Sequence, residues 1–391
     1  MESMKSGGGE RSLLSLLQLI DYDSYDVDLM LFNPSGLFFG MIPEQVNIIS
    51  LGKNYESFTL PLVQSVKTFL FKFKPGAAIR RVMYSRAVNG SNLPELERDR
   101  RSWKYLLPVF EKPVAGYDAA ISYLEGKPNF FVADCVDAKV KIGYIHNDYS
   151  KLGLDASGDK ILFGKFDRIV TVSDECKKVL EKTFPEFAEK FCVIENITSP
   201  KTLEKMAAEI PEEFAEKNGK KIVLTVGRIS QQKGYDIAID AAEILDKKGY
   251  DFKWFSIGKG ELQEEFEKKI SEKNLNGKFV FLGERANPYP YLSGCDIYAQ
   301  TSYYEGKSIA VDEAKILAKP IVATKFSTVY DQLEDGETAL LAEMDTESVA
   351  EKIAQLFDDE NLAKTLSENL KKIKLGNEEE IEKFYALLGE K

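Results

Sequence analysis

Two cations follow a predicted strand in the second half of the chain, in the stretch TVGRISQQKG. The strand ends at Gly227, Arg228 and Lys233 follow it, and a helix is expected to begin near Gly234. A guanidinium binds phosphate oxygens through paired N–H groups, an ammonium adds a second positive charge, and a helix N-terminus adds backbone donors. The stretch therefore predicts a site that neutralises a diphosphate without a metal ion. Two unrelated surface cations are the alternative, because Lys and Arg occupy 52 of 391 positions.

Two carboxylates, Glu305 and Glu313, lie eight residues apart in SYYEGKSIAVDEAKILAKP. The pattern predicts a strand at CDIYAQ, a loop that carries Glu305, and a helix that carries Glu313. Because eight helical residues rise only about 12 Å, one carboxylate can bind a sugar while the other binds the ribose of the same nucleotide. Next to Gly306, the backbone N–H groups of Lys307 and Ser308 would then lie at the phosphates.

Several other chemistries lack the residues they need. His146 is the only histidine, so a histidine-rich metal site is excluded and a Ser/His/Asp triad would depend on that residue alone. GGGERS lacks the Lys-Ser/Thr pair of a Walker-type phosphate loop, and IGKGEL lacks the third glycine of a dinucleotide fingerprint. We interpret the glycines of IGKGEL as a tight turn into a helix at 261–274. No metal and no cofactor are expected.

The elements that must position these residues alternate between strands and helices. Six strands are predicted in each half, at 25–32, 46–50, 118–124, 139–146, 167–173, 190–197, 220–227, 251–258, 278–283, 295–300, 319–324 and 338–343. Such alternation predicts two doubly wound α/β domains of the Rossmann-like kind, with ligands at the carboxyl ends of the strands. We expect an N-terminal domain at 1–199, a C-terminal domain at 200–375, and a final helix in 376–391.

A glycine run, Gly7, Gly8 and Gly9, precedes a helical pattern at the start of the chain. A loop of this kind is normally presented by a strand, but the preceding MESMKS holds only two methionines as apolar residues. We therefore expect residues 1–6 to form at most a strand remnant and the N-terminal sheet to lack one strand. This expectation implies that Met1 is an internal methionine or an artificial boundary.

Charge is distributed unevenly along a chain whose net charge is −11. Residues 61–112 hold 11 basic and 4 acidic side chains, interleaved with aromatic residues such as Phe71 and Trp103. A basic and aromatic segment in an acidic protein predicts contact with an anionic membrane surface, and a solvated helix face is the alternative. The acidic remainder disfavours a nucleic-acid partner.

The compartment is predicted from what the sequence lacks. The longest uncharged stretch, Leu29–Pro43, contains Pro34, Gly36 and Gly40 and is shorter than the ~20 apolar residues of a membrane span. The four cysteines have no CxxC spacing, which is typical of free thiols in a reducing compartment. We expect a cytoplasmic protein that associates peripherally with the inner face of the membrane.

Residues 221–345 resemble the donor-binding half of a retaining GT-B glycosyltransferase of the family that builds bacterial capsules and exopolysaccharides. The matching motifs are GRISQQKG, IGKGEL, FLG, DIYAQTSYYEGKSIAVDEAKILAKPIVAT and ETALL. The N-terminal half resembles the family more loosely, through GGGERSLLSLL, YDVDLML, IHNDYS and DRIVTVSDECKKVL. The resemblance spans nearly the whole chain.

The resemblance implies a role for each matching residue. Arg228 and Lys233 would hold the diphosphate, Glu305 the transferred sugar, and Glu313 the ribose, while His146 would touch the donor sugar near the reaction centre. The implied reaction is metal-independent transfer with retention, in which the two cations stabilise the leaving diphosphate and a leaving-group oxygen accepts the proton of the acceptor.

The implied substrates are a nucleotide-diphosphate sugar, for which we expect UDP, and a lipid-linked or oligosaccharide acceptor. The family often has an aromatic residue in place of Lys307, which leaves the donor sugar open. Two alternatives remain: an epimerase or hydrolase of sugar nucleotides with the same architecture, and a catalytically silent subunit of a polysaccharide assembly complex.

Overall fold

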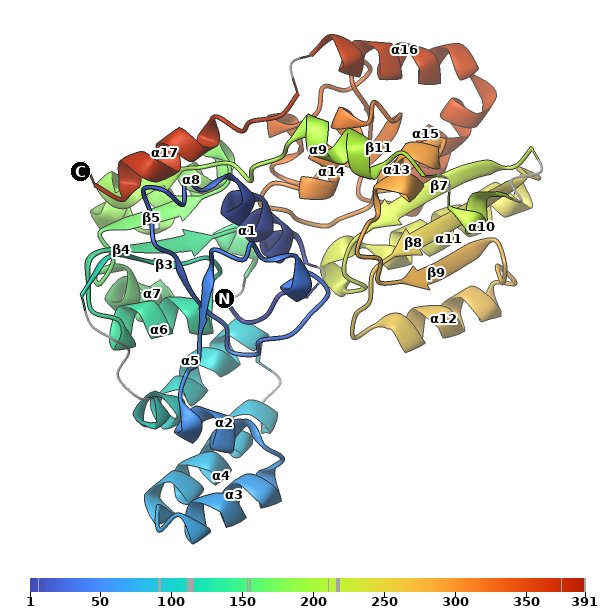
Figure 1. Ribbon diagram of the computed structural model, residues 1–391. Helices are drawn as coiled ribbons and strands as arrows, with labels where there is room; N and C mark the ends of the chain where they lie inside the picture. Colours follow the sequence, from blue (N-terminus) through green and yellow to red (C-terminus); the bar gives the residue numbers. More distant parts are fainter. Residues whose placement is uncertain are drawn as a thin grey trace. The chain divides into compact units, whose positions relative to one another are not determined.

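The computed structural model describes residues 1–5, 7–90, 93–110, 116–152, 154, 156–209, 211–215, 219–373 and 375–389 (Figure 1). Its contacts divide the chain into two compact units. Unit 1 comprises Met1–Met4, Leu16–Glu195 and Glu379–Lys391, and unit 2 comprises Lys5–Ser15 and Asn196–Glu378. Each unit is built from parallel strands that alternate with helices, so the predicted α/β class is confirmed. The sequence pattern gave no sign that Lys5–Ser15 would group with unit 2.

Unit 2 contains a six-stranded parallel sheet in the order β12-β11-β10-β7-β8-β9. Its strands are β7 (Lys221–Val226), β8 (Phe252–Ile257), β9 (Phe279–Gly283), β10 (Ile297–Gln300), β11 (Ile321–Thr324) and β12 (Leu340–Ala342). The residues of β10 and β11 are all buried, as expected when helices cover both faces of a parallel sheet. The strand order reverses between β7 and β10, which pair directly, and this switch point is where open α/β sheets bind ligands.

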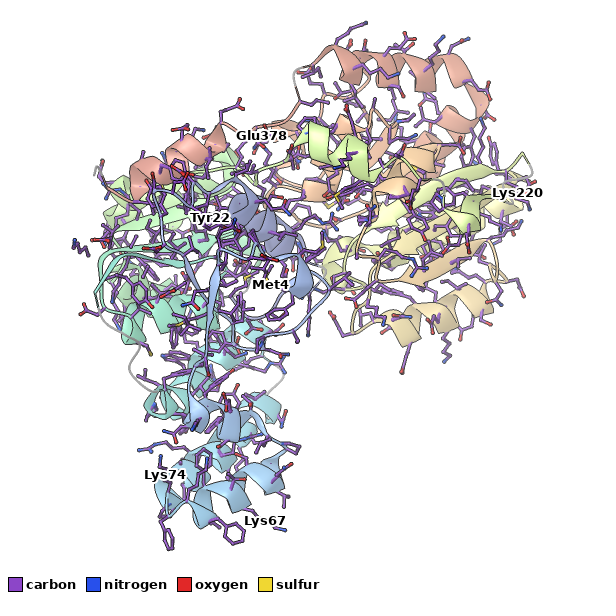
Figure 2. The ribbon with its side chains drawn as sticks, viewed as in Figure 1. Met4, Tyr22, Lys67, Lys74, Lys220 and Glu378 are labelled. Atoms are coloured by element: carbon purple, nitrogen blue, oxygen red, sulfur yellow. The ribbon has the colours of Figure 1, made fainter. Side chains whose placement is uncertain are left out.

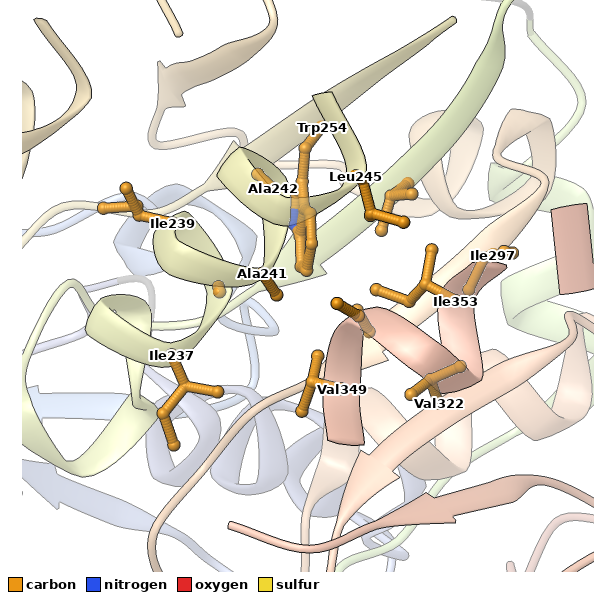
Figure 3. Packing of buried hydrophobic residues seen from close by; sticks show 14 of the residues in the cluster. Ile237, Ile239, Ala241, Ala242, Leu245, Trp254, Ile297, Val322, Val349 and Ile353 are labelled. Atoms are coloured by element: carbon orange, nitrogen blue, oxygen red, sulfur yellow. The ribbon is translucent and has the colours of Figure 1, made fainter. Parts of the chain in front are cut away.

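The helices of unit 2 pack on both faces of this sheet. They are α9 (Pro200–Met206), α10 (Glu212–Ala215), α11 (Tyr235–Lys247), α12 (Gln263–Glu272), α13 (Tyr289–Gly294), α14 (Ile309–Ile316), α15 (Thr346–Asp358) and α16 (Glu360–Lys372). On one face, Leu245 of α11 and Val349 and Ile353 of α15 pack around Trp254 of β8 (Figure 3). The buried indole N–H of Trp254 donates to Thr225 Oγ1 at 3.0 Å. This apolar layer holds the strand ends of the site in place.

Unit 1 contains a four-stranded parallel sheet in the order β3-β4-β5-β6 and a separate two-stranded parallel sheet, β1-β2. The strands are β1 (Asp28–Met30), β2 (Asn47–Ile49), β3 (Tyr117–Ser122), β4 (Ala138–Ile145), β5 (Arg168–Thr171) and β6 (Phe191–Val193). The helices are α2 (Lys53–Thr59), α3 (Leu62–Phe71), α4 (Pro75–Asn89), α5 (Glu95–Leu106), α6 (Lys127–Cys135), α7 (Ala156–Phe163), α8 (Asp174–Thr183) and α17 (Glu380–Leu387), and α1 (Gly8–Leu19) enters unit 1 at Leu16. The twelve strands that the structure describes lie where the sequence predicts them.

Residues Met1–Lys5 form neither a helix nor a strand. Met1 and Met4 are buried, and their carbonyl oxygens accept hydrogen bonds from the N–H groups of Phe32 and Phe38. This arrangement agrees with the expected strand remnant, although Ser6 lies outside the described residues. The missing strand itself stays a prediction.

Only part of the basic segment at 61–112 is a basic surface, which corrects the sequence interpretation. In α5, Trp103 is buried, Arg100 pairs with Asp159 at 2.7 Å, and Arg101 pairs with Glu97 at 3.0 Å. These α5 groups stabilise the fold because carboxylates neutralise the cations. Cations that form no ion pair with any described residue lie mainly in α3 and α4, and the exposed Lys104 of α5 is another. Among the described helices, none has both the length and the apolar character needed to cross a bilayer.

Candidate active site

The loops after β7 and β10 touch at the switch point of the unit 2 sheet. After β7 the chain passes Gly227 and Arg228, forms a short 3-10 turn that ends at Lys233, and enters α11 through Gly234. Gly234 has φ 60°, and a Cβ there would lie 2.0 Å from the carbonyl oxygen of Thr301. Only glycine permits this approach. The predicted cations are thereby brought next to the loop that carries the first predicted carboxylate.

Lys233 and Glu305 form an ion pair at 2.6 Å. The same carboxylate oxygen, Oε1 of Glu305, also accepts hydrogen bonds from Gln300 Nε2 at 2.8 Å and Ser302 Oγ at 2.6 Å. The Thr328 hydroxyl donates to the carbonyl oxygen of Glu305 at 3.0 Å. Glu305 is only 6 % exposed. In the described part of the chain no donor reaches Oε2, so a rigidly held carboxylate keeps one oxygen to accept hydrogen bonds from a ligand.

Arg228 is exposed and forms no ion pair with any described residue. The loop after β8 supports its backbone, because Ile229 N donates to the carbonyl oxygen of Lys259 at 3.1 Å. A Cβ at Gly258 would lie 2.0 Å from the carbonyl oxygen of Gly227, and one at Gly260 would lie 2.0 Å from that of Ile229. The glycines of IGKGEL therefore allow two backbones to meet. Gly260 also begins the predicted tight turn into α12, because Gln263 N donates to its carbonyl oxygen at 3.3 Å.

Glu313 lies within α14 and is 1 % exposed. Arg11 Nη1 donates to its two carboxylate oxygens at 2.8 and 2.5 Å, and the Tyr289 hydroxyl donates at 2.9 Å. The Arg11 guanidinium also lies over the Tyr289 ring, 5.9 Å from its centroid. Burial raises the pKa of Glu313, and Arg11 and Tyr289 only partly oppose this shift. Both of these partners of the Glu313 carboxylate were missed by the sequence reasoning.

The glycine run lies at the first turn of α1, not in a loop ahead of it. Gly7 precedes the helix, and Gly8 and Gly9 are its first two residues. A Cβ at Gly8 would lie 3.7 Å from Cδ1 of Ile309, the first residue of α14. The N-termini of two helices thus lie together in unit 2, and both ends favour an anion.

The N-terminus of α14 is already hydrogen-bonded. Ser308 caps the helix, because its hydroxyl accepts a hydrogen bond from Val311 N at 3.4 Å. The Ser308 N–H donates to Gln332 Oε1 at 2.8 Å, and Gln332 Nε2 donates to the Ser308 carbonyl at 2.9 Å. The sequence predicts that the Ser308 N–H lies at a phosphate. A phosphate could accept a hydrogen bond from this N–H only if the Gln332 side chain turned away. Lys307 and Gly306 lie just before this cap.

His146 follows β4 and belongs to unit 1. Its ring stacks on Tyr144, with centroids 5.5 Å apart, and lies 5.3 Å from the ring of Tyr123. Its backbone N–H donates to Glu125 Oε2 at 3.2 Å. The side chain is therefore held at the carboxyl end of a parallel sheet, and its predicted contact with a donor sugar stays a prediction.

Among the site residues that sequence reasoning missed, Gln300 and Arg11 carry a recognisable signal. Gln300 is a buried polar residue at the end of an apolar strand, and Arg11 lies two residues after the glycine run in GGGER. Tyr289 carries no such signal, since it is an aromatic residue between two prolines at the start of α13. Among the described residues, no group of three or more His, Cys, Asp or Glu side chains could hold a metal ion.

Residues 206–373 match the family model described as "Glycosyl transferases group 1". An N-acetylgalactosamine-N,N'-diacetylbacillosaminyl-diphospho-undecaprenol 4-alpha-N-acetylgalactosaminyltransferase of Campylobacter jejuni is 25% identical over 373 residues, which are 94% of this chain and 92% of the relative. Seven further curated relatives match over 37–53% of this chain and 29–58% of their own length.

Solved structures resemble the whole chain. HepE of Anabaena has a TM-score of 0.69 at 17% identity, covering 99% of this chain and 96% of HepE. WaaG, a glycosyltransferase of lipopolysaccharide biosynthesis, has a TM-score of 0.68 at 13% identity, covering 100% and 99%. The family match lies on the unit that carries Arg228, Lys233, Glu305 and Glu313. Residues 206–373 therefore match the group 1 glycosyltransferases, and the chain has the GT-B fold.

Proposed function

We propose that this glycosyltransferase moves a sugar from a UDP-sugar to a lipid-linked or oligosaccharide acceptor, with retention and without a metal ion, in the synthesis of a surface polysaccharide. The observation that carries the proposal is the shared ion pair of Lys233 and Glu305 at the switch point, at 2.6 Å. It joins a phosphate-binding cation directly to a sugar-binding carboxylate.

The ion pair leaves both groups with free hydrogen-bonding capacity. An ammonium has three donors, so Lys233 can keep its bond to Glu305 Oε1 and give two others to phosphate oxygens. Oε2 of Glu305 can accept hydrogen bonds from sugar hydroxyls. Arg228, exposed and without an ion-pair partner in the described chain, adds a second cation for the diphosphate.

The proposed reaction breaks the bond between the anomeric carbon and the diphosphate oxygen and forms one to the acceptor oxygen. The acceptor's hydroxyl proton passes to the leaving phosphate oxygen on the same face of the sugar, so the products are a glycoside and a nucleoside diphosphate. Arg228 and Lys233 stabilise the negative charge that develops on the diphosphate. The Glu305 carboxylate stabilises the positive charge that develops at the anomeric carbon.

The relatives support the choice of substrates and stereochemistry. HepE has been crystallised with UDP-glucose and with UDP and glucose, which favours a UDP-sugar donor. The name of the Campylobacter jejuni relative specifies an undecaprenyl-diphosphate-linked acceptor and an alpha product. Because UDP-hexosamine donors are α-linked, an α product corresponds to retention.

A two-stage experiment tests the proposal. UDP-, GDP- and dTDP-sugars are first screened by thermal shift, since a ligand at ~100 times its dissociation constant adds about 2.7 kcal/mol. The UDP-sugar that stabilises most is then incubated with polyprenyl-diphosphate-linked sugars, with and without EDTA, and the anomeric configuration of the product is read by NMR. We expect an α-linked product at the same rate in both conditions. Sugar-nucleotide turnover without an acceptor, binding without transfer, an inverted product, or loss of activity in EDTA would contradict the proposal.

Variants of the two carboxylates separate the predicted subsites. Glu305→Gln should lower turnover ~100-fold or more with little change in UDP affinity, because its charge acts on the reacting sugar. Glu313→Gln should weaken UDP binding instead. Glu272→Gln, on the exposed face of α12, is the matched control and should change neither quantity. Reversed phenotypes of Glu305 and Glu313 would refute the assignment.

A further inference from the structure

Helices α3 and α4 of unit 1 carry positive charge that no described carboxylate neutralises. Residues 57–94 contain no acidic side chain and six basic ones, Lys67, Lys72, Lys74, Arg80, Arg81 and Arg86, in a chain whose net charge is −11. The two helices lie side by side at the end of unit 1 (Figure 1), and Lys67 and Lys74 mark that end in Figure 2. Lys67, Arg80 and Arg86 form no ion pair with any residue that the structure describes.

The same helices expose apolar side chains. Of the thirteen large hydrophobic side chains that are exposed in the described part of the chain, seven lie between Leu62 and Met83. In α3, Val63, Lys67, Leu70 and Phe71 follow the i, i+4, i+7, i+8 spacing of one helix face, and all four are exposed. The core side of α3 buries Phe69 instead. An outward apolar stripe of this kind is unusual for a helix that meets only water.

Phe73 adds an aromatic side chain at a strained backbone position. It has φ 53° and is 93 % exposed. Its N–H donates to the carbonyl oxygen of Leu70, and Lys74 N donates to that of Phe69, which is the Schellman ending of a helix. Glycine is the usual residue at this left-handed position, because a bulky side chain costs backbone energy there. Since the Phe73 side chain is almost fully in solvent, packing within the chain does not offset that cost.

We propose that the C-terminal end of α3 docks on the surface of an anionic phospholipid bilayer. The docking surface consists of Val63, Lys67, Leu70, Phe71, Phe73 and Lys74. Its aromatic and aliphatic side chains enter the headgroup layer while the lysines bind lipid phosphates. The surface belongs to unit 1. Its binding to lipid therefore does not depend on which donor the unit 2 site binds.

Charge and shape both favour a bilayer as the occupant. Lys74 Nζ donates to Asn54 Oδ1 and Lys72 Nζ donates to Ser57 Oγ, so both hydrogen-bond partners are neutral side chains. Phe71 is 83 % exposed, beside Phe73. Large apolar side chains that project into solvent can enter the boundary between headgroups and acyl chains. The lysines between them can bind the lipid phosphates at the same surface.

Arg81 is excluded from the docking surface, because its guanidinium is used within the fold. It donates to the carbonyl oxygens of Phe58 at 2.7 Å and Leu60 at 3.2 Å and lies over the Phe58 ring. The variants that test the proposal therefore leave Arg81 intact.

Vesicle flotation of the full chain tests the docking surface. Vesicles of phosphatidylcholine alone are compared with vesicles that also contain phosphatidylglycerol, at about 0.1 M and about 1 M NaCl. We expect binding only to the anionic vesicles, and release at the higher salt concentration. The Lys67→Ser/Lys74→Ser variant should bind about 30-fold more weakly, and Phe71→Ser should also lose binding. Ile161→Ser, at a 72 % exposed position on α7, is the matched control and should bind as wild type.

Two further variants separate docking from folding. Phe73→Gly relieves the left-handed backbone, so it should raise the melting temperature while it weakens vesicle binding; a purely structural residue would not move these two quantities in opposite directions. Phe71→Trp should show a blue-shifted emission on anionic vesicles. Failure of the wild-type chain to bind anionic vesicles at low salt, equal binding to neutral vesicles, or unchanged binding of Phe71→Ser would overturn the proposal. Nucleotide binding by unit 2 is unaffected by any of these outcomes.

Discussion

Replacing Arg11 with methionine would leave Glu313 as a buried carboxylate without its cation. The side chain of Arg11 is 12 % exposed and that of Glu313 is 2 % exposed, with 2.5 Å between their charged atoms. Breaking a buried ion pair by removing one partner costs about 3–5 kcal/mol, because the remaining charge is uncompensated. The Tyr289 hydroxyl still donates to Glu313 at 2.9 Å, so we expect the lower end, about 3 kcal/mol of the free energy of unfolding.

Tryptophan fluorescence allows unit 2 to be followed by itself. The chain has two tryptophans: Trp103 in unit 1 and Trp254 in the core of unit 2. In a Trp103→Phe background, urea titrations of Trp254 emission would compare the parent with Arg11→Met, Glu313→Gln and the double variant. The double variant should recover most of the loss, because no buried charge remains. An exposed ion pair on α12 provides the control, since Lys268→Met should have almost no effect.

The pH dependence gives a second readout for the same variant. Without Arg11, the folded-state pKa of Glu313 should rise further above that of the unfolded chain. The folded state then binds the proton more tightly, so Arg11→Met should be close to the parent below about pH 4 and lose stability as the pH rises. A loss below about 1 kcal/mol at neutral pH, a pH-independent loss, or a double variant no more stable than Arg11→Met would refute the reasoning.

Three further predictions concern other residues. Arg228→Ala and Lys233→Ala should each weaken UDP binding by at least ~10-fold in calorimetry, because each removes a charged hydrogen bond to the diphosphate; unchanged affinity would exclude them from the site. Phe73→Gly should raise the free energy of unfolding by about 1 kcal/mol in urea, and a decrease would show that the aromatic ring packs in solution. Burial raises the pKa of Asp99 to about 6, although the charge of Lys127 opposes this shift. The free energy of unfolding of the parent should therefore fall by about 3 kcal/mol between about pH 4 and pH 7. The Asp99→Asn variant should not show this fall.

The sequence alone predicts the strands and the fold class because the relevant signals are local. Each strand is a short apolar run bounded by glycine, proline or charged residues, and helix-length segments separate the runs, so only a parallel α/β arrangement satisfies them. The positions of Arg228, Lys233 and Glu305 are predictable for the same reason: they lie in loops that follow strand ends, and parallel strands bring their carboxyl ends to one edge.

The pairing of side chains depends on tertiary structure. Arg11 and Glu313 are 302 positions apart, and nothing local to either residue indicates the other. Likewise, Arg100 and Lys67 have the same charge and lie in the same basic segment, yet Arg100 meets Asp159 at 2.7 Å while Lys67 meets no described carboxylate. Composition specifies how many charges a segment carries, but packing decides which of them are neutralised, because an ion pair requires two groups within about 4 Å.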